Sequence, residues 1–88
     1  MRPWRLVFTH QAQKDARKLA HSGLKPKAEF LLSILRVDPL RTPPRFEKLV
    51  GDLEGAYSRR INVQHRLVYQ VLDGEGTVKI LRLWTHYE

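Results

Sequence analysis

Residues 57–69, YSRRINVQHRLVY, place three arginines and a histidine within thirteen residues of strand-like sequence. Arginine presents a planar guanidinium that binds two phosphate oxygens at once. Aromatic side chains on the same sheet surface stack on unpaired bases. The residue types therefore predict contact with an RNA backbone, provided that the arginines reach a common surface.

Alternation of side chains along a strand sorts these residues onto two faces. Arg60 and Arg66 have even positions and are expected on the sheet face away from the helices. Arg82 and His86 are further candidates for that face. Arg59 has the opposite parity, so we expect it to help dock RNA, or to pair with an acidic group, more than to serve chemistry. A bulge would change this assignment.

The aromatic residues near these arginines allow two interpretations. Tyr57, Trp84 and Tyr87 are candidates for stacking on bases. For Tyr57 and Trp84, packing in the core or at its rim is an equal alternative. His65 lies at the turn between two strand segments and is interpreted as structural.

Helical signals occupy the first half of the chain. Residues 3–8 predict a short strand, and Thr9 is a good N-cap for a helix over HQAQKDARKLAH. Gly23 is suited to end that helix. Pro26 opens a second helix, which the Asp-Pro step at 38–39 ends.

Strand signals occupy the second half. Three segments with β-type sequence follow a proline-containing loop and are joined by short turns, at 57–63, 66–72 and 77–84. The predicted order is β-α-α-β-β-β. We expect an α+β fold in one domain, residues 1–88, with a two-helix hairpin on one face of an antiparallel sheet.

The composition narrows the classes of function. The 88 residues carry a net charge of +7, and ten of the sixteen basic residues are arginine. This balance fits a nucleic-acid partner, an acidic protein partner or a solubilising surface. The absence of cysteine excludes disulfides and thiol chemistry and fits a reducing cytoplasm. No apolar run approaches the roughly 20 residues of a membrane span, and the N-terminus lacks a signal-peptide pattern.

Four blocks of the sequence resemble the Txe/YoeB family of bacterial toxins in the wider RelE superfamily. They are FEKL at 46–49, SRRI at 58–61, HRLVY at 65–69 and HY at 86–87. The resemblance covers most of residues 46–88, whereas the N-terminal half matches by its pattern of elements. It implies a RelE-like fold with the element order predicted above.

The resemblance also implies an activity and partners. Members of the family are toxins of type II toxin–antitoxin systems that cleave mRNA in the ribosomal A site and inhibit translation. The expected partners are the ribosome, mRNA and an acidic antitoxin of the YefM/Phd type. No membrane, metal or other cofactor is expected, and a homodimer is left open. The alternatives are a ParE-like toxin that poisons DNA gyrase and a catalytically inactive RNA- or protein-binding module.

Catalytic roles follow from the family pattern. Glu47 corresponds to the carboxylate that acts as general base, and His86 to the general acid. Arg60 and Arg66 correspond to the arginines that stabilise charge on the phosphate. Tyr87 is expected to stack on a base or to aid proton transfer.

One family position differs in this chain. The lysine that relatives carry after the leucine of this block is replaced by Val50, and Lys48 lies on the other side of that leucine. Lys48 substitutes for the family lysine only if the loop turns it inward. The full set expected to contact RNA comprises Lys48, Arg59, Tyr57, Arg82 and Trp84.

Overall fold

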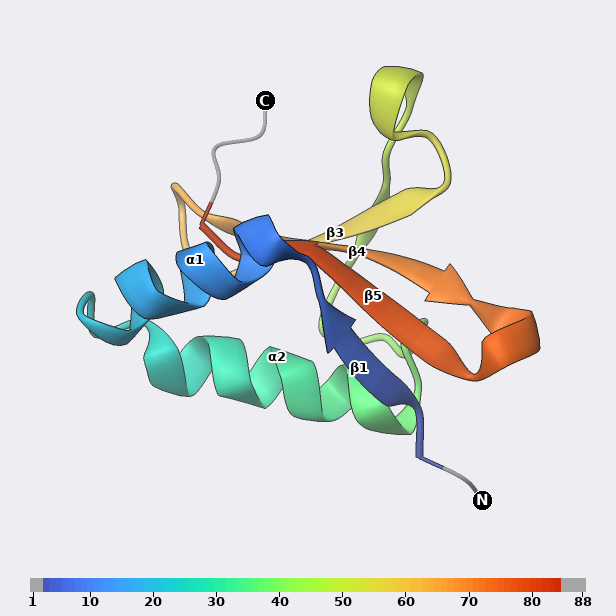
Figure 1. Ribbon diagram of the computed structural model, residues 1–88, viewed down its shortest axis with the longest axis horizontal. Coiled ribbons are helices and arrows are strands. Elements are labelled where there is room, and N and C mark those ends of the chain that lie inside the picture. Colours follow the sequence, from blue (N-terminus) through green and yellow to red (C-terminus); the bar gives the residue numbers. More distant parts are fainter. Residues whose placement is uncertain (1–2, 85–88) are drawn as a thin grey trace.

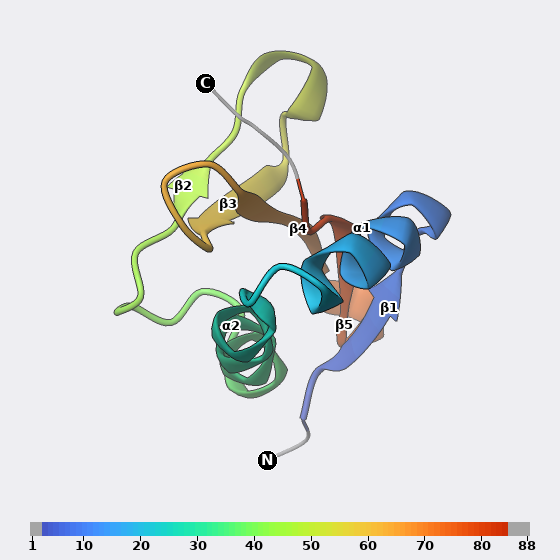
Figure 2. The ribbon, with the colours of Figure 1, turned by 90° about the vertical axis from the view of Figure 1, so that its left-hand side faces the viewer.

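A computed structural model describes residues 3–84 of the chain (Figure 1). The elements are, in chain order, β1 (Arg5–Phe8), α1 (His10–Ala20), α2 (Lys25–Val37), β2 (Glu47–Lys48), β3 (Ala56–Arg60), β4 (Arg66–Leu72) and β5 (Thr77–Arg82). Two single turns of 3-10 helix, Gly51–Leu53 and Asp73–Glu75, lie in the connections. The segment around Gly51–Leu53 projects away from both helices (Figures 1 and 2).

The five strands form one mixed sheet in the order β1-β5-β4-β3-β2. The late strands β3, β4 and β5 are antiparallel neighbours, as predicted, and β2 also pairs antiparallel with β3, whereas β1 pairs with β5 in parallel. Two helices separate β1 from the later strands, so no short turn forces it to run antiparallel to its neighbour. The two-residue strand β2 was not expected from the sequence.

The helix signals in the sequence are confirmed. The Thr9 hydroxyl accepts a hydrogen bond from the Ala12 amide at 3.0 Å and so caps α1. Gly23 follows α1 with a φ of +80°, a conformation that favours glycine. Pro26 lies in the first turn of α2. These local signals set the bounds of the helical hairpin.

The alternation of side chains predicted a strand that continues to Val63, but β3 ends at Arg60. Beyond Arg60 the chain turns, and the Asn62 side-chain oxygen accepts hydrogen bonds from the amides of Gln64 and His65 at 2.9 and 2.7 Å. An asparagine that closes its own turn in this way competes with continued strand pairing. The observed β4 matches the predicted strand.

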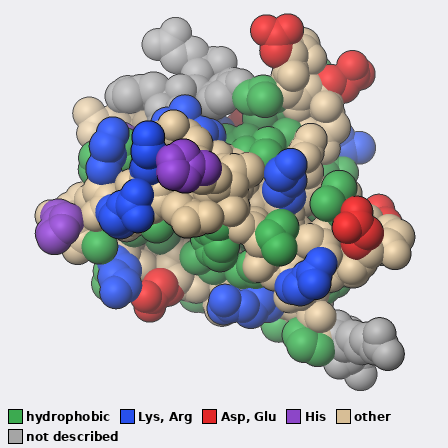
Figure 3. All heavy atoms as spheres, in the orientation of Figure 1, with side chains coloured by type: hydrophobic (Ala, Val, Ile, Leu, Met, Phe, Trp, Pro, Cys, Tyr) green, Lys and Arg blue, Asp and Glu red, His purple; other side chains and the backbone are tan. Residues whose placement is uncertain are grey.

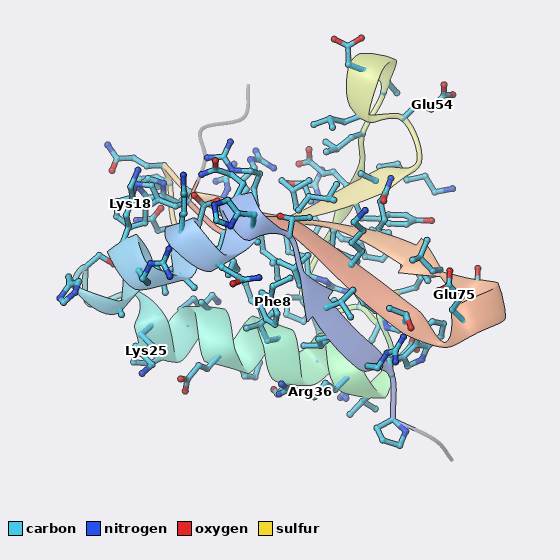
Figure 4. All side chains as sticks on the ribbon, viewed as in Figure 1. Phe8, Lys18, Lys25, Arg36, Glu54 and Glu75 are labelled. Atoms are coloured by element: carbon cyan, nitrogen blue, oxygen red, sulfur yellow. The ribbon has the colours of Figure 1, made fainter. Side chains whose placement is uncertain are left out.

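Both helices pack on one face of the sheet and share a single core with it (Figure 2). The buried core residues come from α1, α2, the strands and the positions just after β3 and β5, and are Ala12, Leu19, Ala28, Leu31, Leu35, Ile61, Leu67, Tyr69, Val78, Ile80 and Leu83. Phe8 of β1 packs against this core from the edge (Figure 4). The opposite face of β3 and β4 is thereby left for polar side chains.

Charge is unevenly distributed over the surface. Lys and Arg side chains gather over α1, whereas acidic side chains lie at the connections that contain Glu54 and Glu75 and beside Lys25 on α2 (Figures 3 and 4). The exposed cations of α1 are Lys14, Arg17 and Lys18. Within residues 3–84, no helix has both the length and the apolar character to cross a membrane.

Candidate active site

The pairing of β2, β3 and β4 brings one carboxylate and two arginines to the same face. Glu47 lies opposite Ser58, and Arg60 lies opposite Arg66. Residues directly opposite each other in an antiparallel pair point to the same side, as do Ser58 and Arg60 two positions apart in one strand. The four side chains therefore share the sheet face that points away from the helices.

Glu47 and Arg66 approach each other directly across this face. A carboxylate oxygen of Glu47 lies 3.6 Å from Nη1 of Arg66. The same nitrogen donates a hydrogen bond to the hydroxyl of Ser58 at 3.3 Å. The Arg66 side chain is 17% exposed, whereas that of Glu47 is 47% exposed. Arg66 is thus held in the sheet surface, and the carboxylate is open to a ligand.

A hollow of about 480 Å³ lies over these residues. The hollow also extends past the end of β3, because its lining includes the turn at 61–63, Lys27 from α2 and Arg45 from the loop before β2. Among the described residues, four cations and one carboxylate line the hollow. A positive surface of this kind attracts a polyanion, and of these lining groups the carboxylate is suited to accept a proton.

Arg59 does not contact this hollow, and the expectation that it binds RNA is wrong. Its side chain points to the helix side of the sheet and the residue is fully buried. Its Nε donates to the hydroxyl of Tyr69 at 3.1 Å, and its Nη1 and Nη2 donate to backbone carbonyls of residues 39, 41 and 44. The alternation of side chains had correctly placed Arg59 on the face opposite to Arg60, but its partners there are backbone carbonyls and a tyrosine hydroxyl rather than RNA or an acidic group.

Burial and hydrogen bonding also affect Tyr69. Desolvation raises the pKa of its phenol, and the nearby Arg59 guanidinium opposes that rise only in part. Tyr69 therefore stays protonated and donates a hydrogen bond to the Pro39 carbonyl at 2.8 Å.

Arg82 is also engaged elsewhere, contrary to its expected place beside Arg60 and Arg66. Its Nε donates to the Asp15 carboxylate of α1 at 2.8 Å, and its Nη2 donates to the Trp84 carbonyl at 3.1 Å. A register shift in the pairing of β4 with β5, between Val68 and Tyr69, interrupts the alternation on which the prediction relied. The Arg82 side chain remains 38% exposed.

Asp15 is a buried residue that the sequence analysis missed. Its carboxylate accepts hydrogen bonds from Arg82, from the Leu83 amide at 3.0 Å and from Gln11 at 3.1 Å. Desolvation is the largest single influence and raises the pKa, but the hydrogen bonds together outweigh it, so the pKa of Asp15 is lowered. Asp15 is the one acidic residue of an otherwise basic helix, and this is the signal that could have found it.

The remaining predicted RNA contacts lie apart from the Glu47 carboxylate. Lys48 is opposite Tyr57 in the β2–β3 pair, so both point to the other side of the sheet from Glu47. Lys48 therefore does not take the inward position that a substitute for the family lysine would need. Tyr57 stacks on Tyr69 with ring centroids 5.6 Å apart.

Trp84 and His65 form a stacked pair with ring centroids 3.8 Å apart. Trp84 is half-buried and His65 is buried, which supports the structural interpretation of His65. Base stacking by Trp84 would have to use the other face of its indole.

Two predicted catalytic residues, His86 and Tyr87, lie outside the described residues. Lys27 and Arg45, in contrast, line the hollow without having been predicted. The excess of Lys and Arg in the composition was the signal for them, but it did not distinguish these two from other surface cations. In the described part, residues 3–84, no group of His, Asp and Glu side chains is arranged to hold a metal ion.

The fold and the site define a small toxin of the RelE type. Residues 8–87 match the family described as YoeB-like toxin of bacterial type II toxin–antitoxin systems, and the chain belongs to this family. The toxin YoeB of Streptomyces coelicolor is 34% identical over 85 residues, which cover 94% of this chain and 99% of that protein.

Solved structures agree with this assignment. The YoeB/ParE toxin from Agrobacterium tumefaciens superposes with a TM-score of 0.83 at 27% identity, covering 94% of this chain and 99% of that one. A YoeB–YefM complex from Staphylococcus aureus gives a TM-score of 0.75 at 38% identity, covering 96% and 98%. This protein is therefore a toxin of a type II toxin–antitoxin system.

Proposed function

We propose that this toxin is a ribosome-dependent endoribonuclease that cleaves mRNA in the ribosomal A site. The observation that carries the proposal is the Glu47 carboxylate facing the Arg66 guanidinium at 3.6 Å in a hollow lined by four cations. That arrangement fits one phosphodiester and its adjacent 2′-hydroxyl. A toxin that acts by binding gyrase has no need of a proton acceptor among phosphate-binding groups.

In the proposed reaction, Glu47 removes the proton of the 2′-hydroxyl. The 2′-oxygen then attacks the adjacent phosphorus, and the bond from phosphorus to the 5′-oxygen breaks. Arg66 and Arg60 stabilise the negative charge that develops on the phosphate. His86 gives a proton to the leaving 5′-oxygen, since an imidazole exchanges protons near neutral pH. Tyr87 stacks on a base or assists that transfer. The products are a 2′,3′-cyclic phosphate and a 5′-hydroxyl.

The ribosome is part of the proposal because the site is open. The hollow, of about 480 Å³, takes only a short piece of an mRNA strand, which extends well beyond it. Positioning the strand by the ribosome supplies the alignment that a shallow site does not provide by itself. We also propose that an acidic antitoxin segment silences the toxin by covering this basic surface. A YoeB of Staphylococcus aureus has been solved with YefM, which supports a partner of that type.

Single-turnover cleavage of mRNA in a programmed ribosome, with mapping of the new 5′ ends, tests the proposal. The wild-type chain should cleave in the A-site codon. Glu47→Gln should slow cleavage by roughly 10²- to 10⁴-fold, the range of general acid–base contributions. Glu54→Gln, at an exposed loop position, is the matched control. Wild-type toxin that leaves mRNA intact but inhibits DNA supercoiling by gyrase would favour the alternative.

A further inference from the structure

The loop that leads into β2 converges on a single buried side chain. Three backbone carbonyls, of Pro39, Arg41 and Pro44, accept hydrogen bonds from the Arg59 guanidinium. The Phe46 ring lies over that guanidinium, with its centroid 5.1 Å from Cζ. One arginine therefore organises residues 39–46, the segment that immediately precedes Glu47.

Arg59 makes these contacts without an acidic partner. Within residues 3–84, no Asp or Glu forms a salt bridge with it, although it is fully buried. A buried charge is expensive unless hydrogen bonds satisfy it. Here the carbonyls and the Tyr69 hydroxyl replace water around the guanidinium. Conversely, removal of Arg59 takes away this donor from the part-buried carbonyls of Arg41 and Pro44, whereas the Pro39 carbonyl keeps its hydrogen bond from the Tyr69 hydroxyl.

The strand that carries Glu47 cannot hold its own position. β2 has two residues, both exposed, and it lies at the edge of the sheet. Two residues of pairing give little independent stability. Its position must therefore come from the segments on either side, and the preceding one is held by Arg59.

Sheet geometry places this support directly beneath the site. In β3, Arg59 follows Ser58, the residue opposite Glu47, and Arg59 itself lies opposite Leu67, which follows Arg66. The guanidinium is on the helix side and the Glu47–Arg66 pair is on the other side. Movement of the loop by the width of one side chain would separate the carboxylate from Arg66.

We propose that Arg59 is a positioning residue for Glu47: it fixes the 39–46 segment so that the Glu47 carboxylate lies opposite Arg66. The inference rests on the proposed function only for its effect on cleavage. Its structural part, that Arg59 holds the segment before Glu47, is independent of any activity. The fork of the guanidinium is essential because three carbonyls in different directions need several donors in one plane, which lysine lacks.

Amide hydrogen exchange of the isolated toxin tests the structural part. The reporter is the Leu49 amide, which donates to the Ala56 carbonyl at 2.9 Å next to β2. Arg59→Lys should speed exchange at Leu49 by roughly tenfold or more while β4 and β5 keep their protection. Tyr69→Phe, which removes one hydroxyl from the same network, should give a smaller effect in the same place. It keeps the test decisive if Arg59→Lys does not fold.

A matched control is Arg36→Lys. Arg36 is exposed on α2, nine residues and about 13 Å along the helix from Lys27 at the hollow (Figure 4). It should leave Leu49 exchange unchanged. Unchanged exchange in both Arg59→Lys and Tyr69→Phe would overturn the proposal.

A double-mutant cycle on ribosome-bound mRNA tests the effect on cleavage. At saturating ribosome, Arg59→Lys should slow single-turnover cleavage by about 10²-fold when Glu47 is present. In a Glu47→Gln background it should add less than about threefold, because the group that it positions is already gone. An equal factor in both backgrounds would show that Arg59 does not act through Glu47. If Arg59→Lys changed only the ribosome concentration needed for half-maximal rate, Arg59 would act in docking to the ribosome, and this result would also contradict the proposal.

The two readouts separate the two hypotheses. If the wild-type toxin fails to cleave, or if Glu47→Gln cleaves as well as wild type, the proposed function fails. The exchange experiment then still decides whether Arg59 holds the segment before Glu47.

Discussion

Arg59 and Arg60 are neighbours in the chain and lie on opposite sides of β3. Arg59 is fully buried and binds backbone carbonyls, whereas Arg60 is exposed and lines the hollow that contains Glu47. Two identical side chains thus have different tasks because a strand alternates its side chains. The predictions below separate residues that touch the substrate from those that support the fold.

Substitution of either arginine in the hollow should slow the chemical step. Arg66→Ala and Arg60→Ala should each reduce the single-turnover rate at saturating ribosome by roughly 10²-fold, the effect of losing one donor to a developing charge. Arg17→Ala on α1 removes an exposed arginine outside the hollow and serves as the control for lost charge. The proposed assignment fails if both variants in the hollow keep the wild-type rate and change only the affinity for ribosomes.

The two cations that the sequence analysis missed should act through binding. Lys27→Ala and Arg45→Ala remove positive charge from the rim of the hollow without touching Glu47. Each should flatten the salt dependence of affinity for a single-stranded RNA by about 0.7, the value for one lost phosphate contact. Titrations of labelled RNA over a range of salt concentrations give the slope. Slopes that match the wild-type value would place both residues outside the RNA path.

Glu47→Gln should separate activity from stability. The Glu47 side chain is nearly half exposed, and its contact with Arg66 is 3.6 Å long. Ion pairs of this kind contribute between zero and about 1 kcal/mol, so the free energy of unfolding should change by less than about 1 kcal/mol. Urea denaturation measures it. A loss of several kcal/mol would mean that Glu47 supports the fold and would make any loss of cleavage uninformative.

Asp15→Asn should have the opposite profile, with a cost in stability that depends on pH. The folded-state pKa of Asp15 lies below its ordinary value of 3.8, so protons bind more readily to the unfolded chain. The stabilisation by Asp15 is therefore complete above about pH 4 and declines as the pH falls through the folded-state pKa. At pH 7 the variant should lose about 1.5–3 kcal/mol, the usual range for hydrogen bonds to a charged group.

Urea denaturation of wild type and Asp15→Asn from pH 7 down to pH 3 checks this prediction. The difference in unfolding free energy between the two proteins should shrink at the acid end, because protonation removes from the wild type what the substitution removes from the variant. A difference that stays constant over this range would show that the ionised carboxylate of Asp15 contributes nothing to stability.

The sequence by itself determined the local features of this protein. The cap at Thr9, the stop at Gly23 and the proline in the first turn of α2 set the helices because each acts on its own turn. The alternation of side chains along a strand is also a local property, and it assigned Arg59 and Arg60 to opposite faces. The family blocks indicated Glu47 and Arg66, which the structure brings within 3.6 Å of each other.

The tertiary structure alone decided which partners the charged side chains take. Asp15 and Arg82 are 67 residues apart and meet because α1 packs beside β5, and Arg59 reaches carbonyls 15 to 20 residues earlier in the chain. The local sequence around a charged side chain is the same whether that side chain contacts solvent, a phosphate or a buried carbonyl. The packing of distant segments decides which of these partners it contacts. A buried charge without hydrogen bonds is too costly, so burial leaves only the arrangement in which the charge is fully hydrogen-bonded.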